Sequence, residues 1–256
     1  MTTQANIDHA VHLLRSGKVV GIPTETVYGL GADASNPIAV RQIFALKGRP
    51  VNHPLIVHVQ NREEAEKWGL FDQRAVEIAD RYWPGPLTLI LPKQDHVLDE
   101  VTGGLNTIGI RCPKHPITQS LLKSFGSGIA APSANKFGKI SPTDATHVAN
   151  EFGSELYILD GGSSTIGIES TILDLCDVRP AILRPGYVTE EDIEQEWGPL
   201  GHSNRPAPGT LKAHYAPKTS LLLSQNVKAD CHRLEKLGLN VARMEAKPAI
   251  SYARVL

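Results

Sequence analysis

Short apolar runs and amphipathic helical patterns alternate along most of this chain, and this alternation constrains the fold more than any other feature. The apolar runs are bounded by glycine or proline, as buried strands often are. Chains that interleave strands with helices form a sheet with helices packed on it. Near residues 155–184 strands follow one another without a helix, so we expect that part to be antiparallel. We therefore predict an α/β fold with a mixed sheet flanked by helices.

The same patterns predict the individual elements. We expect Pro37 in the first turn of a helix and Asp72 as an N-cap. Residues 21–33 are rich in hydroxyls and glycine, so we expect a turn there after a strand that breaks at Pro23. The expected helices are 7–15, 38–46, 62–68, 72–83, 116–125, 143–152 and 189–197, and the expected strands are 18–24, 54–59, 87–91, 107–112, 128–132, 155–160, 170–175 and 181–184.

The composition changes after residue 198, which divides the chain into three expected parts. Residues 1–198 would form the main domain, and the prolines of residues 199–218 predict a stiff linker. Residues 219–256 predict a partial C-terminal α/β domain with strands at 220–225 and 239–244 and a helix at 228–237. This tail is too short for an independently stable domain. We expect a truncated second domain; the alternative is a tail that docks on the main domain.

Composition restricts the class of protein. The net charge of −1 gives no overall attraction to nucleic acid or to a membrane, so an anion site must be local. Cys112, Cys176 and Cys231 are far apart and odd in number, which argues against a disulfide framework and a zinc site. No apolar run approaches the about 18 residues of a membrane span, and the first residues do not resemble a secretory leader. We expect a cytoplasmic protein with no membrane partner.

Positive charge is concentrated between an expected helix and an expected strand. The segment contains Lys47-Gly48-Arg49-Pro50 and continues to His58. Residues 55–57 are typical of a buried strand, whereas the charges ahead of them cannot be buried without partners. A loop that concentrates cations at a strand entrance suits a polyphosphate or a carboxylate ligand. The simpler alternative is a solvated Lys/Arg turn.

Four further segments combine a strand end with polar residues. They are residues 21–33, Ala131-Pro132-Ser133-Ala134-Asn135, Glu169-Ser170-Thr171-Ile172 and Leu183-Arg184-Pro185-Gly186. The sequence contains no Gly-x-x-x-x-Gly-Lys-Ser/Thr phosphate loop and no Gly-x-Gly-x-x-Gly after a strand. Any nucleotide site must therefore be built in another way.

These five segments, in this order, closely resemble the YrdC-type family of L-threonylcarbamoyladenylate synthases. Residues 208–217 resemble the linker of the two-domain members. The resemblance implies a YrdC-like twisted mixed sheet, with residues 1–198 as the catalytic domain. It also implies that L-threonine, bicarbonate or CO₂, and ATP are converted to threonylcarbamoyl-AMP and pyrophosphate. The product would serve the threonylcarbamoyladenosine modification of tRNA.

The resemblance implies an ATP site in which Lys47 and Arg49 are the catalytic cations. Arginine holds phosphate oxygens with two parallel bonds, whereas lysine acts as a mobile point charge. His53 stands where the family usually carries asparagine, and its imidazole would add positive charge near phosphate when protonated. The other implied ATP contacts are Thr107, Ser133, Asn135, Ser141, Arg184 and Tyr215.

The resemblance also implies a threonine site. Arg111 ends an apolar strand, and its planar guanidinium suits the carboxylate of the substrate. Without the resemblance, Thr26 is typical of a turn hydroxyl, and His58 of a hydrogen-bonded structural histidine. The implied threonine contacts are Thr26, His58, Arg111, Ala131 and Ser170.

Cofactors, partners and alternatives complete the hypothesis. Mg²⁺ would accompany ATP, with no metal-ligating residues assigned, and downstream proteins would transfer the threonylcarbamoyl group to tRNA. The linker would close the cleft as a lid that protects a mixed anhydride from water. One alternative is a YrdC-like module that binds double-stranded RNA or tRNA without synthase activity, against which the near-neutral net charge argues. The other is a paralogue with the fold alone, against which the intact motifs argue.

Overall fold

The computed structural model describes residues 2–209, 222 and 224–242. The chain divides into two compact units, Met1–Ala216 and Pro217–Leu256. The described part of the expected linker, residues 199–209, therefore belongs to the first unit. None of the helices in the described ranges is long and apolar enough to cross a membrane.

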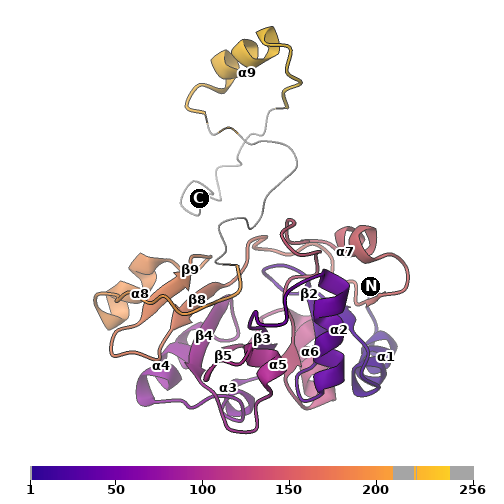
Figure 1. The fold of residues 1–256 in the computed structure, drawn as a ribbon, viewed down its shortest axis with the longest axis vertical. Coiled ribbons are helices and arrows are strands. Elements are labelled where there is room, and N and C mark those ends of the chain that lie inside the picture. Colours follow the sequence, from indigo (N-terminus) through magenta and orange to yellow (C-terminus); the bar gives the residue numbers. More distant parts are fainter. Residues whose placement is uncertain (1, 210–221, 223, 243–256) are drawn as a thin grey trace. The chain divides into compact units, whose positions relative to one another are not determined.

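A mixed nine-stranded sheet forms the centre of the first unit (Figure 1). Its spatial order is β7-β1-β2-β6-β3-β5-β4-β8-β9. The sheet contains both parallel pairs, such as β3 with β5, and antiparallel pairs, such as β4 with β5. The strands are β1 (Val20–Ile22), β2 (Gly29–Asp33), β3 (Ile56–His58), β4 (Leu87–Pro92), β5 (Thr107–Arg111), β6 (Ile129–Ala130), β7 (Tyr157–Ile158), β8 (Thr171–Asp174) and β9 (Ala181–Arg184).

The predicted mixed sheet is confirmed, with one strand that the sequence analysis missed. β8 and β9 are antiparallel, as expected, whereas β7 pairs in parallel with β1. The segment expected as a turn contains β2, which pairs with β1 on one side and with β6 on the other. Leu30 and Ala32 in β2 are fully buried. Pairing on both sides satisfies the backbone of this glycine-rich segment, and that depends on tertiary structure rather than on local propensity.

The helices begin and end close to the expected residues. Asp72 caps α4, where its side chain accepts a hydrogen bond from the Ala75 amide at 2.7 Å. α2 begins with Pro37, and Gly48 caps its C-terminal end with a φ of 63°, which favours glycine. The short α5 was not expected. The helices are α1 (Gln4–Arg15), α2 (Pro37–Lys47), α3 (Arg62–Ala65), α4 (Gln73–Tyr82), α5 (Asp99–Thr102), α6 (Pro116–Phe125), α7 (Ala145–Phe152), α8 (Glu190–Trp197) and α9 (Val227–Lys236).

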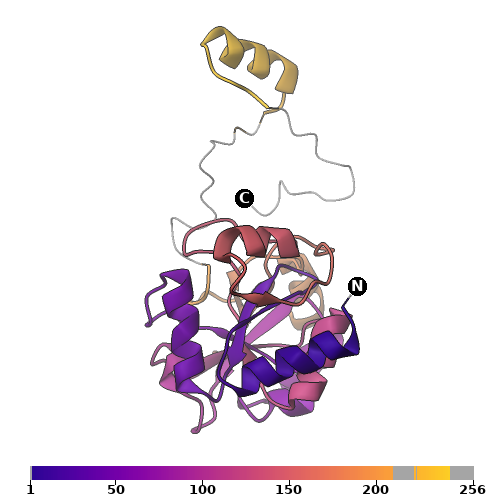
Figure 2. The same ribbon diagram turned by 90° about the vertical axis from the view of Figure 1, so that its right-hand side faces the viewer.

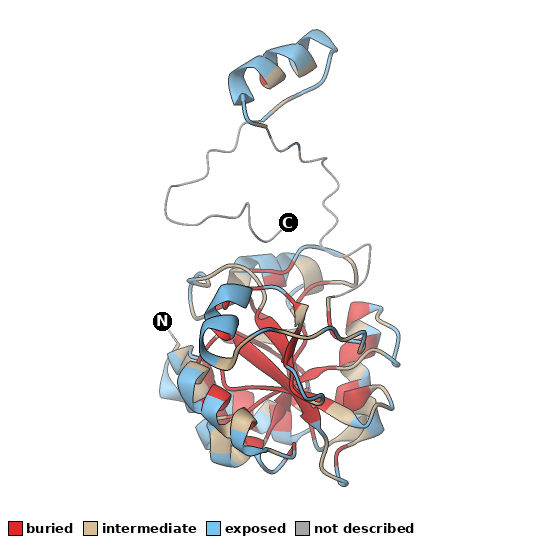
Figure 3. Ribbon diagram, turned by 90° about the vertical axis from the view of Figure 1, so that its left-hand side faces the viewer, coloured by how far each residue is buried: buried red, intermediate tan, exposed pale blue. Residues whose placement is uncertain are grey.

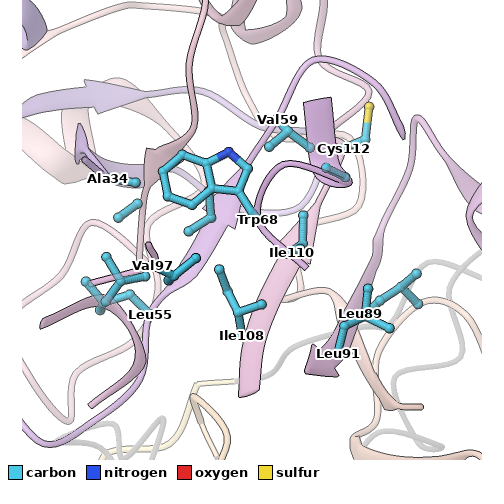
Figure 4. Packing of buried hydrophobic residues seen from close by; sticks show 14 of the residues in the cluster. Ala34, Leu55, Val59, Trp68, Leu89, Leu91, Val97, Ile108, Ile110 and Cys112 are labelled. Carbon is cyan, nitrogen blue, oxygen red and sulfur yellow. The ribbon is translucent and has the colours of Figure 1, made fainter. Parts of the chain in front are cut away.

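Helices cover both faces of the sheet, so buried residues are concentrated in the strands (Figures 2 and 3). α2 and α4 pack on the first face, in the main apolar cluster. Figure 4 shows part of this cluster, with Trp68 among Val59, Ile110 and Cys112. A β-carbon at Gly128 would lie 2.6 Å from the Trp68 ring, so this packing requires glycine there.

The second face of the sheet is covered in two separate places. Near β1 and β6, helices α1 and α6 pack on Val20, Ile22 and Ile129. Near β4 and β8, a small cluster joins Ile56, Ile90, Ile172 and Ala207. Neighbouring residues such as Ile56 and Val57 belong to different clusters because side chains alternate along a strand. The strand ends between the two covered regions are where the candidate site lies.

The second unit is described only around α9. Asn226 caps this helix by accepting from the Ala229 amide at 3.2 Å, and α9 covers most of the expected helix 228–237. Residues 239–242 lie in the second expected strand of this unit, and they form no strand in the structure. Of the other expected strand, 220–225, residues 222, 224 and 225 are described and form no strand, and the remaining three lie outside the described residues.

Candidate functional site

A cavity lies at the strand ends on the second face of the sheet. Ile56 and Ala131, from the two apolar clusters of that face, form part of its lining. The structure brings together eight of the residues assigned to the site from the sequence, from β3, β5, β9 and four loops. These eight are Thr26, Arg49, His58, Arg111, Ala131, Ser133, Ser170 and Arg184.

Arg111 is buried at the end of β5 and is held by two segments, the one with Gly85 and the one with Glu25 and Thr26. Its Nε donates to the Gly85 carbonyl at 3.1 Å, and its Nη1 donates to Thr26 Oγ1 at 2.8 Å. Its Nη2 donates to Glu25 Oε1 at 2.6 Å, in an ion pair in which both side chains are buried. Thr26 also contacts Thr24, with 2.9 Å between the two hydroxyl oxygens. The guanidinium therefore has a fixed orientation beside a hydroxyl-lined wall.

His58 presents a neutral imidazole to the cavity. The side chain is buried, and its Nδ1 has no hydrogen-bond partner. Burial, and after it the positive charge of Arg111, lowers the pKa of His58 to about 3. At neutral pH the ring therefore carries no charge, and Nδ1 is free to bond to a ligand.

Among the arginines that line the cavity, Arg49 donates the fewest hydrogen bonds to the described part of the protein. Its Nη2 donates to the Pro54 carbonyl at 2.9 Å, while its Nε is buried without a partner. Burial lowers the pKa of Arg49 to about 10, against the attraction of Glu169. The side chain therefore stays charged at neutral pH, with donors available for an anion.

Arg184 differs from Arg49 because all five of its N–H groups are donated within the protein. Nε and Nη2 donate to the Ser170 carbonyl at 3.0 and 2.9 Å, and Nη2 also donates to Ser170 Oγ at 3.1 Å. Nη1 donates to the Pro208 carbonyl at 3.0 Å and to a Glu169 carboxylate oxygen. A guanidinium has five such donors, so none remains for a ligand in this arrangement.

Lys47 organises the loop that contains Ser133 and Asn135. Its buried Nζ donates to the carbonyl oxygens of these two residues, at 2.5 and 2.6 Å. Burial, and after it the positive charge of Arg49, lowers the pKa of Lys47 to about 7. Lys47 does not line the cavity. When its amine is protonated it has three N–H groups, and these two hydrogen bonds use two of them.

Four other assigned residues do not line this cavity in the structure. Asn135 Nδ2 donates to the carbonyls of the 136–139 loop. Ser141 donates to Glu169 at 2.6 Å, and His53 lies edge-on to Phe137. Thr107 begins the strand that Arg111 ends, and four steps of about 3.3 Å separate them by about 13 Å.

The surroundings of His53 disfavour protonation of its imidazole. Burial lowers the pKa of His53, and the positive charge of Arg49 lowers it further. Tyr215 lies outside the described residues.

Comparisons with known proteins identify the family of this chain. A model of the Sua5/YciO/YrdC family, named Telomere recombination, matches residues 12–186, which is more than half of the chain. The chain belongs to this family. The threonylcarbamoyl-AMP synthase of Bacillus subtilis (strain 168) is 45% identical over 235 residues, which make up 88% of this chain and 68% of that protein.

Two solved structures of the family come from Pyrococcus abyssi Sua5. The crystal structure of that protein complexed with L-threonine has a TM-score of 0.87 at 38% identity, and the match covers 96% of this chain and 79% of that one. In the second structure a histidine and the tyrosine that follows it are both replaced by alanine. Its TM-score is 0.74 at 47% identity, over 76% of this chain and 57% of the Pyrococcus chain.

Two carboxylates of this family member, the buried Glu25 and the partly exposed Glu169, were not assigned from the sequence. Glu25 pairs with Arg111, and Glu169 lines the cavity, where it pairs with Arg184. Both glutamates lie inside motifs that carried the resemblance, Pro-Thr-Glu-Thr and Glu-Ser-Thr-Ile. These motifs could therefore have identified them as candidate site residues. The expected ligands are anions, which cations bind. An acidic residue in a turn is more typical of a solvated surface, so the two glutamates were not assigned to the site.

Charge in this region of the family fold favours an anionic ligand. Among the described residues, the cavity is lined by the three guanidinium groups of Arg49, Arg111 and Arg184 and by one carboxylate, that of Glu169. Glu25 pairs with Arg111 without lining the cavity. In the described part of the chain, no three His, Cys, Asp or Glu side chains are grouped so as to hold a metal ion. The excess of cations therefore matches the local anion site that the near-neutral net charge required.

Proposed function

We propose that this protein is a threonylcarbamoyl-AMP synthase, a nucleotidyltransferase that uses L-threonine, bicarbonate or CO₂, and ATP. The observation that carries the proposal is the cationic cavity at the strand ends, in a chain 45% identical to a protein with this activity. The complex of the Pyrococcus relative with L-threonine supports the choice of amino acid.

The reaction has two steps that a cationic pocket can assist. The threonine amine condenses with bicarbonate to give a carbamate and water. A carbamate oxygen then attacks the α-phosphorus of ATP, and pyrophosphate leaves with the electrons of the broken P–O bond. Such a transfer depends mainly on positioning and on the stabilisation of developing negative charge. Fixed guanidinium groups supply both.

Threonine would bind at the end of β5. Arg111 would take the carboxylate, and the neutral Nδ1 of His58 would bond to a polar hydrogen of the amino acid. Thr26 and Ser170 line the same region through buried hydroxyls, and Ala131 limits its size. A neutral imidazole is suitable there, because a second positive charge beside Arg111 would be disfavoured both by burial and by repulsion from the guanidinium.

ATP would bind beside Arg49, whose free donors can hold phosphate oxygens. Lys47 would contribute its remaining N–H, and Ser133 lines the same wall. A nucleoside triphosphate is an extended ligand. Thr107, at the start of β5, would therefore contact the end of the nucleotide that lies away from the phosphates.

Mg²⁺ would enter with the nucleotide. Magnesium usually keeps several waters and takes one or two carboxylates besides phosphate oxygens. Glu169 is the one carboxylate among the described residues that line the cavity, and it lies near Arg49. The site therefore fits a metal held chiefly by the nucleotide, with Glu169 as its protein ligand, and the metal would neutralise phosphate charge.

The linker would limit access of water to the mixed anhydride. Pro208 and Gly209 line the cavity, which brings the start of the linker to the site. The sequence has a single His-Tyr pair, His214-Tyr215, five residues after Gly209. A histidine and the tyrosine that follows it are also the residues replaced in the Pyrococcus variant. We assign this pair to the lid because the segment resembles the linker of the two-domain members. The product would pass to proteins that transfer the threonylcarbamoyl group to tRNA.

Pyrophosphate release tests the proposal. The purified chain, with ATP and magnesium, should release pyrophosphate only when both L-threonine and bicarbonate are present. Release that is independent of threonine would assign the protein to another class of ATP-using enzyme. Tight binding of double-stranded RNA without any turnover would favour the RNA-binding alternative instead.

A further inference from the structure

Glu25 is a buried carboxylate whose two oxygens both have partners. The residue is 6% exposed, and its side chain does not line the cavity. Oε1 accepts from Arg111 at 2.6 Å, and Oε2 accepts from the backbone amide of Lys114 at 3.0 Å. The carboxylate is thus fixed between a loop that follows β5 and the guanidinium at the end of β5.

This arrangement fixes the guanidinium of Arg111 in turn. Its three bonds, to Gly85, Thr26 and Glu25, involve all three of its nitrogens. Of the five N–H groups of an arginine, one on Nη1 and one on Nη2 are left. The guanidinium is therefore held in place by the protein while it keeps one donor on each terminal nitrogen.

Recognition of a carboxylate by arginine depends on the orientation of its planar donors. A side chain that must be ordered during binding loses affinity through that ordering, whereas a fixed one does not. We propose that Glu25 is a positioning residue for the amino-acid carboxylate, acting through Arg111 and never touching the substrate. This inference rests on the function proposed above and assigns to Glu25 a role in affinity for the amino acid.

Charge alone would produce the opposite effect. Glu25 is negative and lies one guanidinium away from the expected substrate carboxylate, so removing its charge would strengthen threonine binding if repulsion were dominant. If orientation is dominant, the same change weakens binding. The sign of the effect therefore separates the two interpretations.

The test is the substitution Glu25→Gln, because an amide has one acceptor oxygen and can satisfy only Arg111 or the Lys114 amide. We expect L-threonine to bind about tenfold or more weakly in calorimetric titrations, with a nonhydrolysable ATP analogue bound within about twofold of wild type. Glu151→Gln is the matched control. Glu151 also accepts from one backbone amide and one cation, Lys136 N and Lys139 Nζ, but it does not line the cavity.

A second probe isolates the carboxylate. L-threoninamide lacks this group, so its weak binding should be the same in wild type and in Glu25→Gln. The preference for L-threonine over the amide should therefore decrease in the variant. A purely structural defect would weaken both ligands and the nucleotide together, and that result would overturn the positioning role.

Lys114→Pro provides a milder variant in case Glu25→Gln does not fold. Proline removes the backbone N–H that Glu25 Oε2 accepts, while the bond to Arg111 remains. We expect a smaller loss of threonine affinity in the same direction. Unchanged or tighter threonine binding in the folded variants would refute the inference. If wild type binds no L-threonine, the proposed function itself is wrong.

Discussion

Arg184 Nη1 donates to the Pro208 carbonyl oxygen at 3.0 Å, which ties the start of the linker to the end of β9. The same nitrogen pairs with Glu169. A residue expected to contact ATP is therefore fully engaged in holding three parts of the site together. A nucleotide could use this guanidinium only by replacing one of its present partners.

The segment from Ser203 to Gly209 is a strap rather than a free lid. Asp174 Oδ2 accepts from Ser203 Oγ at 2.6 Å and from Arg205 Nε at 2.8 Å. Ala207 then packs with Ile90 and its neighbours on the second face of the sheet. The described part of the linker thus forms a wall of the cavity, so lid movement would have to begin after it.

Arg184→Lys should destabilise the first unit, because an ammonium has three donors in place of five. Some of the acceptors of Ser170, Glu169 and Pro208 would then be left buried without a partner. We expect a loss of about 2–4 kcal/mol in the free energy of unfolding, measured by urea denaturation. Arg81→Lys, at an exposed pair with Glu196, is the control and should change little. Equal stability of the two variants would contradict the role of Arg184 as an anchor.

Arg49→Ala should abolish turnover while leaving the fold intact. Arg49 makes one hydrogen bond to the protein, to the Pro54 carbonyl, and its other donors are available for phosphate. We expect nucleotide affinity to fall roughly 10- to 100-fold, the effect of losing a charged hydrogen bond. Calorimetry with an ATP analogue measures this, and Lys139→Ala removes a cation outside the cavity as a control. Wild-type turnover in Arg49→Ala would exclude the assigned role.

Arg111→Lys should weaken L-threonine more than ATP. An ammonium keeps the charge, yet it cannot reproduce the planar donors that contact Thr26, Glu25 and Gly85 together. Separate titrations of the two substrates check this difference. A threonine affinity that matches wild type would show that the carboxylate binds elsewhere.

Stability should decrease below neutral pH because of His58. Its pKa is about 3 in the folded protein, well below the usual value near 6.5. Between these values the unfolded chain binds a proton at this residue and the folded chain does not, so stability is complete above pH 6.5 and falls as the pH decreases. The slope is at most about 1.4 kcal/mol per pH unit.

His58→Asn removes this proton and serves as the comparison. The difference in unfolding free energy between wild type and the variant should shrink as the pH falls from about 6.5 to about 4. Urea denaturation at a series of pH values measures it. A difference that stays constant over this range would mean that the imidazole is protonated in the folded state.

Much of the fold was predictable because it depends on short-range patterns. The ranges of α6 and β9 agree with the expected ones, and Asp72 is the N-cap that its position before an amphipathic segment indicated. β2 was missed because its glycine-rich sequence has no strand pattern of its own. It becomes a strand through pairing with β1 and β6, which no local window contains.

The sequence by itself determined which residue types meet at the site, since eight of the assigned side chains line one cavity. Only the tertiary structure decided what each of them can do there. Glu25 and Arg111 are 86 residues apart in the chain, and Arg184 reaches a carbonyl 24 residues further on. Whether a buried cation is free or already bonded depends on such distant partners. A local motif specifies the charge, and the folded chain determines which donors remain for a ligand.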